Sequence, residues 1–413
     1  MTMLSFSQFI TEEKNLHLVH AEDAIIDGGV TGTRQIINYL RAIRDMFAGN
    51  SKSKINMNTK FDGAPAVFAG YDPADGKFFV AKKGIFNKNP KIYKTPADVD
   101  ADTSGDLNAK LKLALAEFPK LGMSKNVVLQ GDFLYSAEDL KRVEVDGQSY
   151  VTFHPNTIVY SIPAESELAK TIQRSKIGVV WHTVYRGDSL ETMSASFGEK
   201  IAGTLKTVAA VWSVDAYFDD VSGKATFTKA ETDTITKILS AAGTIFQKLP
   251  ANVLNGLAEN ETRRVRVNAF INSKIREGER IRNPVTFVDD MIKALNDFFD
   301  KDIASKKSAA GQEAARAKKA EVMAYFEQTK KSDLVAMFTL YNHIIDAKQM
   351  VISKLNEVGQ MKTFLRTKDG YEVTGQEGFV VADHLGKNAL KLVNRLEFSK
   401  ANFSNEFIKG WQR

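Results

Sequence analysis

The chain has 413 residues, of which 43% are hydrophobic, enough for two or three domains with ordinary cores. No stretch reaches the ~20 consecutive apolar residues of a membrane helix, so we expect no membrane partner and a location in a cytoplasm. The absence of cysteine excludes disulfides and thiolate metal sites, and the net charge of +6 is compatible with a polyanionic partner such as nucleic acid.

The first predicted element is an amphipathic helix over residues 33–47. The glycine-rich run before it, residues 28–33, lacks the Gly-Lys-Ser/Thr of a phosphate loop, and we interpret it as a helix start capped by threonine. We assign residues 1–50 to an N-terminal helical segment that packs on the catalytic domain. The apolar residues of the helix recur at helical spacing: Ile36, Ile37, Leu40, Ile43 and Phe47.

Strands dominate the next part of the chain. Residues 66–70 and 77–81 flank an Asp-Pro-Ala-Asp-Gly turn and predict a β-hairpin. Residues 107–118 have helical spacing. We therefore expect residues 51–225 to form the first part of an α+β domain built around antiparallel strands. Three further segments are rich in β-branched and aromatic residues: 126–134, 150–160 and 178–185.

Residues 226–365 predict a helical insertion domain. Ala, Glu, Lys, Leu and Met dominate this region, and its apolar residues recur at spacings of three and four. Residues 304–319, rich in Ala, Lys, Ser and Gly, predict a solvated helix end or a mobile loop. Strand signals return in residues 366–413, which we expect to close the α+β domain around the insertion.

The most informative motif is K-F-D-G at residues 60–63, on the edge of a predicted strand. Alone, it is also compatible with a surface lysine before an Asp-Gly turn. It is followed, in order, by E-G-F-V-V at residues 377–381 and A-L-K-L-V at residues 389–393. This ordered set resembles the motifs of the covalent nucleotidyltransferase superfamily, which contains ATP-dependent DNA ligases, RNA ligases and mRNA-capping enzymes.

The resemblance covers roughly residues 55–185 and 370–398. It implies an α+β fold: an antiparallel-sheet adenylyltransferase domain, of the ATP-grasp-like ligase type, with a large all-α insertion. It also implies that Lys60 attacks the α-phosphorus of ATP, which yields lysyl-AMP and pyrophosphate. Because a free lysine has a pKa of ~10.4, we expect nearby cations such as Lys391, or a bound metal, to favour the neutral amine.

The same resemblance assigns roles to other residues. Glu377 would bind Mg²⁺, or Mn²⁺ in its place, during lysine adenylation. Lys391 would contact the α-phosphate. Asp62 and Gly63 of the first motif would contact the nucleotide. Asp132, in V-L-Q-G-D-F, takes the place of the usual glutamate and would hold the ribose and share the metal.

Three further residues match motifs less closely. Tyr160 matches the aromatic residue that stacks on the purine, although an ordinary core position is an equal alternative. Lys82 and Lys83 match a basic segment that contacts phosphate, and a solvated pair of charges beside a turn is the alternative. Val393 stands where the superfamily usually has a second lysine.

Two departures favour an RNA-ligase-like member, and hence RNA over DNA as the substrate. DNA ligases usually have arginine two residues after the motif glycine, where this chain has Pro65. The sequence also ends soon after Lys391, where DNA ligases and capping enzymes normally continue into an OB domain. The run at residues 17–23 resembles uncharacterised proteins of large tailed bacteriophages, which implies nucleic-acid repair in a host bacterial cytoplasm.

The densest basic segment lies in the predicted insertion and includes Arg263, Arg264 and Arg266. Arginine forks can hold backbone phosphates, so these residues are candidates for nucleic-acid contact. The alternative is a helix face on which arginines pair with neighbouring glutamates. His182-Thr183 matches half of a two-histidine phosphoesterase signature, but the second half is missing.

The leading hypothesis is an ATP-dependent polynucleotide ligase that seals 5′-phosphate to 3′-hydroxyl ends through lysyl-AMP. One alternative keeps the nucleotidyl transfer but changes the acceptor to a protein, a small molecule or an RNA cap. Another is a catalytically inactive protein that binds nucleic acid. The sequence does not indicate an oligomeric state.

Overall fold

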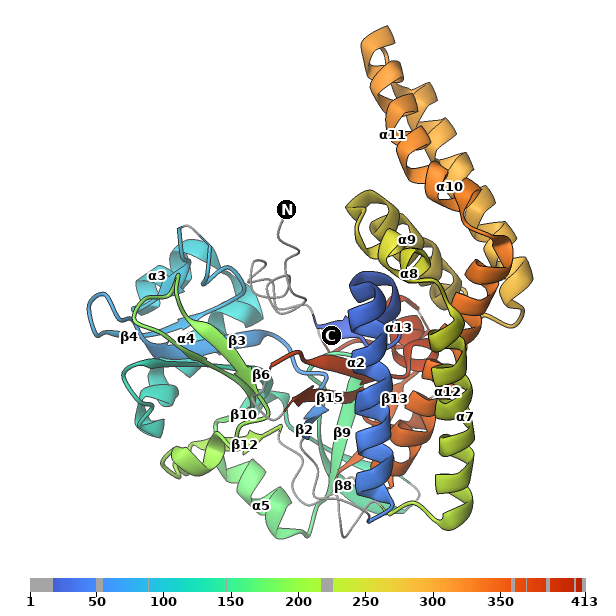
Figure 1. Ribbon diagram of the computed structural model, residues 1–413. Coiled ribbons are helices and arrows are strands. Elements are labelled where there is room, and N and C mark those ends of the chain that lie inside the picture. Colours follow the sequence, from blue (N-terminus) through green and yellow to red (C-terminus); the bar gives the residue numbers. More distant parts are fainter. Residues whose placement is uncertain are drawn as a thin grey trace.

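The computed structural model describes residues 18–49, 55–87, 89–145, 147–216, 226–357, 361–368, 370–383, 387–404 and 406–410. Strands fill the left and centre of Figure 1, and helices cover the right side. The fold is mixed α/β with mainly antiparallel sheets, which confirms the coarse class predicted from the sequence.

Sheet A brings together strands from the two ends of the described chain. Its order is β1, β16, β15 and β2; β1 runs parallel to β16, and the other pairs are antiparallel. The E-G-F-V-V strand therefore lies next to the strand that ends with Lys60, and the A-L-K-L-V strand follows it on the far side. The bounds are β1 Val19–His20, β2 Ile55–Lys60, β15 Gly378–Asp383 and β16 Leu390–Val393.

Sheet B forms the lobe at the left of Figure 1. It includes the predicted hairpin, in which β3 pairs with β4 in antiparallel fashion. Its order is β11, β10, β6, β3, β4 and β5, and β12 pairs in parallel with β10. The bounds are β3 Ala66–Tyr71, β4 Phe78–Ala81, β5 Ile92–Tyr93, β6 Val127–Ser136, β10 Ile177–Arg186, β11 Ser194–Phe197 and β12 Val211–Asp215.

Sheet C contacts the loop that follows Lys60, at the start of its strand β9. Its order is β14, β13, β9, β8 and β7, with all pairs antiparallel. The bounds are β7 Lys141–Val145, β8 Gln148–Phe153, β9 Ile158–Pro163, β13 Lys362–Arg366 and β14 Tyr371–Thr374.

The helices α2, α7 to α12 and α13 lie on the right side of Figure 1, where α10 and α11 project as a long pair. The helix α13 follows β16 in the chain; of the others, α3 and α4 lie on the lobe of sheet B, and α5 follows β9. The bounds are α2 Ala24–Phe47, α3 Pro96–Asp102, α4 Gly105–Glu117, α5 Glu167–Arg174, α7 Lys229–Lys248, α8 Ala251–Ala258, α9 Glu261–Arg276, α10 Pro284–Ser305, α11 Ala309–Gln328, α12 Lys331–Asn356 and α13 Arg395–Phe403.

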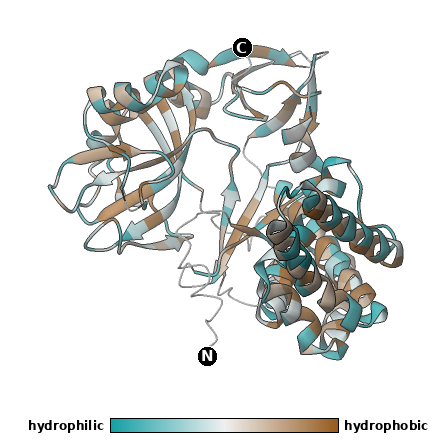
Figure 2. Ribbon diagram, turned by 90° about the horizontal axis from the view of Figure 1, so that it is seen from above, coloured by the Kyte–Doolittle hydropathy of each residue, from teal (hydrophilic) through white to brown (hydrophobic). Residues whose placement is uncertain are grey.

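The large helical region shares its core with sheet A. Buried residues of α2 and of α7 to α12 form one cluster with Val381, Leu390 and Leu392 of the sheet. A second core lies between sheet B and α4, and a third contains residues of sheet C. Seen from above, the sheet B lobe and the helices lie on opposite sides of the molecule, and hydrophobic residues concentrate along the strands (Figure 2). One face of sheet A is thus covered by helices.

Two sequence expectations about helices were wrong. The first helix begins at Ala24 and is interrupted at Gly29 (φ 53°, ψ −136°), a conformation that glycine adopts without strain. Thr33 does not cap a helix start; its hydroxyl donates to the Gly29 carbonyl at 2.7 Å. In the segment 304–319, expected to be a helix end or a loop, α10 does end at Ser305, but the residues from Ala309 onward form a new helix, because alanine favours helix and Ser308 caps its start.

Candidate active site

The K-F-D-G motif begins at the last residue of β2, in the same sheet as the two downstream motifs. In sheet A, Lys60 pairs with Gly378 of β15, and Val380 of β15 pairs with Lys391 of β16. This register brings Glu377 Oε2 to 2.5 Å from Lys60 Nζ. The structure therefore brings the predicted nucleophile, carboxylate and second lysine together, although they are distant in the sequence.

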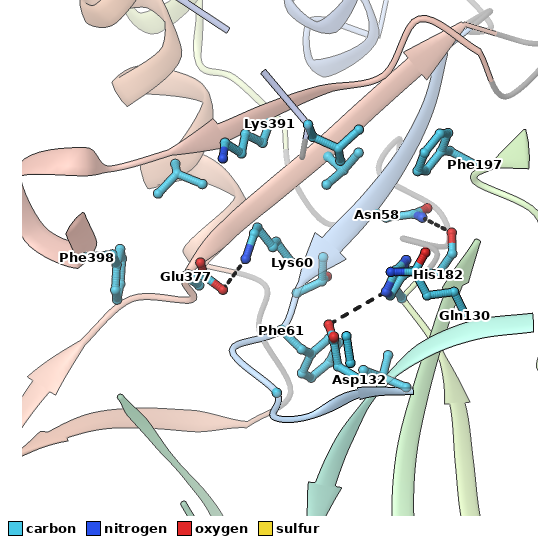
Figure 3. A pocket seen from close by; sticks show the side chains of 18 of the residues that line it. Asn58, Lys60, Phe61, Gln130, Asp132, His182, Phe197, Glu377, Lys391 and Phe398 are labelled. Carbon is cyan, nitrogen blue, oxygen red and sulfur yellow. Dashed lines mark hydrogen bonds and ion pairs between the residues drawn. The ribbon is translucent and has the colours of Figure 1, made fainter. Parts of the chain in front are cut away.

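A cavity of about 450 Å³ lies between sheet A and sheet B (Figure 3). Sheet A contributes Lys60, Glu377 and Lys391 to its wall, and sheet B contributes Asp132 and His182. Its size is within the range of small-molecule sites, about 300–1,000 Å³. Other lining residues include Asn58, Phe61, Gly63, Lys83, Gln130, Phe197 and Phe398.

The pocket shifts the pKa values of Lys60 and Lys391 in opposite directions. Burial lowers the pKa of Lys60, but Glu377, Asp132 and Asp62 outweigh that effect and raise it. Burial and the charge of Lys60 lower the pKa of Lys391 to about 8. The expectation that the Lys60 amine is poised by a lowered pKa is therefore wrong for the protein alone, because its contact with Glu377 stabilises the ammonium.

The predicted nucleotide contact of Asp62 is wrong, because its carboxylate is used within the protein. It accepts hydrogen bonds from Asn156 Nδ2 (2.6 Å) and from the backbone N–H groups of Thr157 (2.6 Å) and Ile158 (2.8 Å). The side chain thus ties the motif loop to the start of β9. Its function is to fix the backbone that carries Lys60.

The predicted purine stacking by Tyr160 is also wrong. Its ring is fully buried, stacked at 5.3 Å between centroids on Phe153, and its hydroxyl accepts from the Asp62 N–H at 2.7 Å. Tyr160 is therefore a second support for the motif loop. The aromatic rings that do line the cavity are those of Phe61, Phe197 and Phe398.

Gly63 lines the cavity where the motif loop touches sheet B. A Cβ atom at this position would lie 2.4 Å from Asp132 Cβ, so any larger residue would push the loop away from β6. Asp132 lines the cavity too, and burial raises its pKa to about 7. The close approach places the Asp132 carboxylate beside the loop that follows Lys60.

Lys82 and Lys83, the two lysines after the first hairpin, lie in different surroundings. Lys83 lines the cavity, and its predicted phosphate contact stays a prediction. Lys82 lies outside it: its Nζ is 2.9 Å from Asp102 Oδ2 and 5.8 Å from the centroid of the Tyr93 ring. The predicted phosphate contact by Lys82 is therefore wrong, because its charge is used to hold α3 on the hairpin.

The three arginines proposed for nucleic-acid contact have protein partners. Arg263 is 8% exposed, donates to the backbone carbonyls of Gly256, Glu321 and Val322, and lies 4.6 Å over the ring of Tyr325. The predicted nucleic-acid contact by Arg263 is wrong, because its hydrogen bonds join α8, α9 and α11.

The neighbouring arginines are also engaged. Arg264 Nε lies 3.8 Å from Asp27 Oδ1, and the Arg266 guanidinium lies 3.9 Å from the centroid of the Phe298 ring. Both contacts hold α9 against other helices. Neither arginine supports the predicted nucleic-acid surface.

Sequence reasoning missed His182 as a pocket residue. It lies on β10 with its ring facing Asp132 (Figure 3). The available signal was a polar residue in the middle of the strongly apolar segment 178–185. The segment was instead compared with a phosphoesterase signature that it does not complete.

The donor groups of the cavity decide which metal could bind there. Within the described residues, no three histidine, aspartate or glutamate side chains converge as a metal site. Glu377 Oε2 is buried, and no group other than Lys60 satisfies it in the described part of the chain. One carboxylate is what Mg²⁺ needs when nucleotide phosphates and water supply the other ligands. The donor set therefore fits Mg²⁺ that binds together with a nucleotide.

A family model described as a family of unknown function, DUF6267, matches residues 15–407. The chain belongs to the DUF6267 family. No curated protein and no solved structure matches this DUF6267 member. Among its described residues, no helix combines the length and the apolar composition that crossing a bilayer requires.

Proposed function

We propose that this DUF6267 member is a covalent nucleotidyltransferase of the ATP-dependent polynucleotide ligase type, with RNA favoured over DNA. One observation carries the proposal. Lys60, Lys391 and Asp132 lie on three strands and Glu377 directly precedes a fourth, and all four residues line one cavity. Motif residues matched by chance would be scattered over the fold. The two mainly antiparallel sheets that enclose this cavity also support an adenylyltransferase-like fold.

In the first step, Lys60 Nζ forms a bond to the α-phosphorus of ATP while the bond from that phosphorus to the β-phosphate oxygen breaks. The products are lysyl-AMP and pyrophosphate. The attacking amine must lose a proton, and Glu377 Oε2, 2.5 Å from Nζ, is in position to take it. Asp62 and Tyr160 keep the lysine in place by fixing its loop.

Lys391 is the residue we assign to the α-phosphate, where negative charge accumulates during the transfer. Lys83, on the opposite wall, is a second cation for the phosphates. Mg²⁺, or Mn²⁺, held by Glu377 and the nucleotide phosphates, would supply positive charge to the leaving pyrophosphate. Asp132 faces His182, so we assign the metal to Glu377 and not to both carboxylates.

In the later steps, AMP passes to a 5′-phosphate end, and an adjacent 3′-hydroxyl then displaces AMP and joins the strands. The support for this part is the resemblance of the three motifs to polynucleotide ligases. Pro65, at the position where DNA ligases usually have arginine, favours RNA. ATP and such ends are both present in a bacterial cytoplasm, where we expect the protein to act.

The proposal is tested with the purified full chain, [α-³²P]ATP or [α-³²P]GTP, and Mg²⁺. We expect a label on the protein from ATP that survives denaturation and is released by acid. The labelled protein is then offered single-stranded and nicked RNA and DNA with 5′-phosphate ends. Sealing of RNA ends is the predicted result.

Each other outcome selects a different reading. A labelled protein that seals none of these substrates would transfer AMP to another acceptor, such as a protein, a small molecule or an RNA cap. A protein that binds RNA but takes no label, and carries no nucleotide by intact mass, would be a nucleic-acid-binding protein without the transferase activity.

A further inference from the structure

His20 is a polar residue of the cavity that the lysine adenylation step, as described above, does not use. It is the last residue of β1, a strand outside the three nucleotidyltransferase motifs that runs parallel to β16. In this pairing His20 stands opposite Lys391, and the Ala21 N–H donates to the Lys391 carbonyl at 2.9 Å. Residues paired across neighbouring strands present their side chains on the same face of a sheet. His20 and Lys391 accordingly both line the cavity.

The chain around His20 fixes the place of its ring. The His20 carbonyl accepts a hydrogen bond from the Asp23 N–H at 3.0 Å, where the chain passes from β1 into α2. The imidazole Nδ1 is buried and has no hydrogen-bond partner among the described residues. The residue as a whole is only half-buried and lines the open volume. Nε2 is therefore the ring nitrogen that faces the cavity.

The surroundings of the ring decide which nitrogen carries hydrogen. Burial lowers the pKa of His20 well below its usual value, and neighbouring cations act in the same direction, Lys391 foremost among them. The ring is therefore neutral at pH 7 and carries one hydrogen. On Nδ1 that hydrogen would have no acceptor and would lie among cations, which favour a lone pair there. On Nε2 it can be donated to a ligand in the cavity.

The ion pairs of this region leave one cation beside His20 for a ligand. Lys348 and Arg395 pair with the two carboxylates that follow β1, and Lys60 pairs with the glutamate of the second motif. Lys391 belongs to none of these three pairs and faces the open volume. An N–H donor next to such a cation suits an anion with several acceptor oxygens, and a phosphate group is an anion of this kind.

The strand order of sheet A indicates which phosphate His20 can reach. The strand of Lys391, β16, lies between the strand of His20 on one side and the strands β15 and β2 on the other. Lys60 and Lys391 extend from this sheet into the cavity (Figure 3). In phosphoryl transfer, the attacking and leaving atoms lie roughly in line on the phosphorus. With the α-phosphate at Lys391 and the attack from Lys60, the leaving phosphates extend toward His20.

We propose that His20 Nε2–H donates a hydrogen bond to the β- or γ-phosphate of ATP, the part that leaves as pyrophosphate. This inference rests on the proposed function and adds to it a binding residue from a strand outside the three motifs. Lys391 keeps its contact with the α-phosphate. His20 holds the leaving group on the side of Lys391 that is remote from the attacking lysine.

The experiment compares three ligands and three variants. The ligands are ATP, inorganic pyrophosphate, and AMP, which lacks the β- and γ-phosphates. Their binding to the full chain is measured by calorimetry without Mg²⁺, so that no transfer competes with binding. His20→Phe removes both ring nitrogens, His20→Gln places an amide near the position of Nε2, and His20→Asn places it near the position of Nδ1.

The wild type should bind ATP more tightly than AMP. In His20→Phe and His20→Asn, the affinities for ATP and pyrophosphate should fall about tenfold, because one hydrogen bond to a charged group is lost. The affinity for AMP should not change. His20→Gln should bind all three ligands as the wild type does. A merely structural role of His20 would instead weaken the binding of ATP and AMP together.

A folded His20→Phe variant with unchanged affinity for ATP overturns the inference, and so does an equal loss of affinity for ATP and AMP. If His20→Phe does not fold, the other two variants decide, and any result except tighter ATP binding by His20→Gln than by His20→Asn overturns it.

Failure of the proposed function gives a different result. A wild type that binds ATP more tightly than AMP, but takes no label when Mg²⁺ is added, refutes the nucleotidyl transfer alone, since calorimetry needs no covalent step. A wild type that binds neither ATP nor pyrophosphate overturns both proposals.

Discussion

Two regions of this protein bury charged residues and use them differently. At the interface between sheet A and the helices, Lys348 lies 2.7 Å from Glu22, and Arg395 lies 2.8 Å from Asp23. In the cavity between sheets A and B, Lys391 is half-buried and faces an open volume. The comparison shows that a buried charge indicates a site when it faces a cavity, and indicates architecture when protein partners surround it.

The largest effect on stability is expected at the paired cluster. Lys348→Met leaves the buried Glu22 carboxylate with Arg395 at 3.4 Å as its remaining cation, and should lower the free energy of unfolding by about 3–5 kcal/mol. Urea unfolding measures this loss. Adding Glu22→Leu to Lys348→Met should recover most of it. An unchanged unfolding free energy in the single variant would show that the cluster is not architectural.

The converse is expected for the lysine that faces the cavity. Lys391→Met should reduce the rate of self-labelling with ATP by about 10²–10³, because a cation that stabilises the transferred phosphate is lost. Stability should not fall, because burial already disfavours the charge of Lys391. Lys82→Met, whose lysine pairs with Asp102 outside the cavity, is the matched control. Equal labelling rates in the two variants would contradict the distinction between a lysine that faces the cavity and a lysine that is paired within the protein.

A pH dependence is expected where α2 meets α9. Burial and the charge of Asp23 raise the pKa of Asp27 from 3.8 to about 6, so the folded protein holds this proton more tightly than the unfolded chain. The stability from protonated Asp27 is fully present below pH 3.8 and is lost as the pH rises through about 6.

Asp27→Asn should remove this dependence. Relative to the wild type, the variant should gain roughly 3 kcal/mol between acidic and neutral pH, since each tenfold change in proton affinity is about 1.4 kcal/mol. Its amide oxygen can still accept from Asn268 Nδ2, as Asp27 does at 2.7 Å. Denaturant unfolding at several pH values tests this, and parallel curves for the two proteins would contradict it.

The smallest effect is expected at Arg266. Its contact with Phe298 is a cation–π pair at a partly exposed position, so Arg266→Ala should cost about 1 kcal/mol or less. Because the arginine is engaged with the protein, the salt dependence of RNA binding should keep its slope. If Arg266→Ala reduced the slope of the salt dependence by about one, Arg266 would be a phosphate contact after all.

The sequence predicted several residues that line the cavity, but not the contacts of every side chain it named. The order of the three motifs identified Lys60, Glu377 and Lys391, and the hairpin over residues 66–81 followed from local turn chemistry. The motifs predict that Asp62 and Tyr160 contact the nucleotide, but in the fold both side chains fix the motif loop. Which face a strand residue presents depends on packing between sheets, which no local pattern records.

Other features depended on contacts distant in the sequence. The bulge that turns His182 into the cavity follows from pairing with β6. From the sequence alone, the arginines of α9 could equally have formed a phosphate-binding surface. Only the structure shows that their partners lie on α8, α11 and α2. Charge density along the chain therefore could not distinguish the two regions compared above.

The most direct test of the account is to find the atom that carries the nucleotide. The full chain is incubated with ATP and Mg²⁺, digested, and its peptides are mapped by mass, with Lys60→Arg as the control that can keep the ion pair to Glu377. The account predicts one AMP on the peptide that contains Lys60 and none in the variant. AMP on Lys391, or an unmodified protein that was also free of nucleotide when purified, would contradict it.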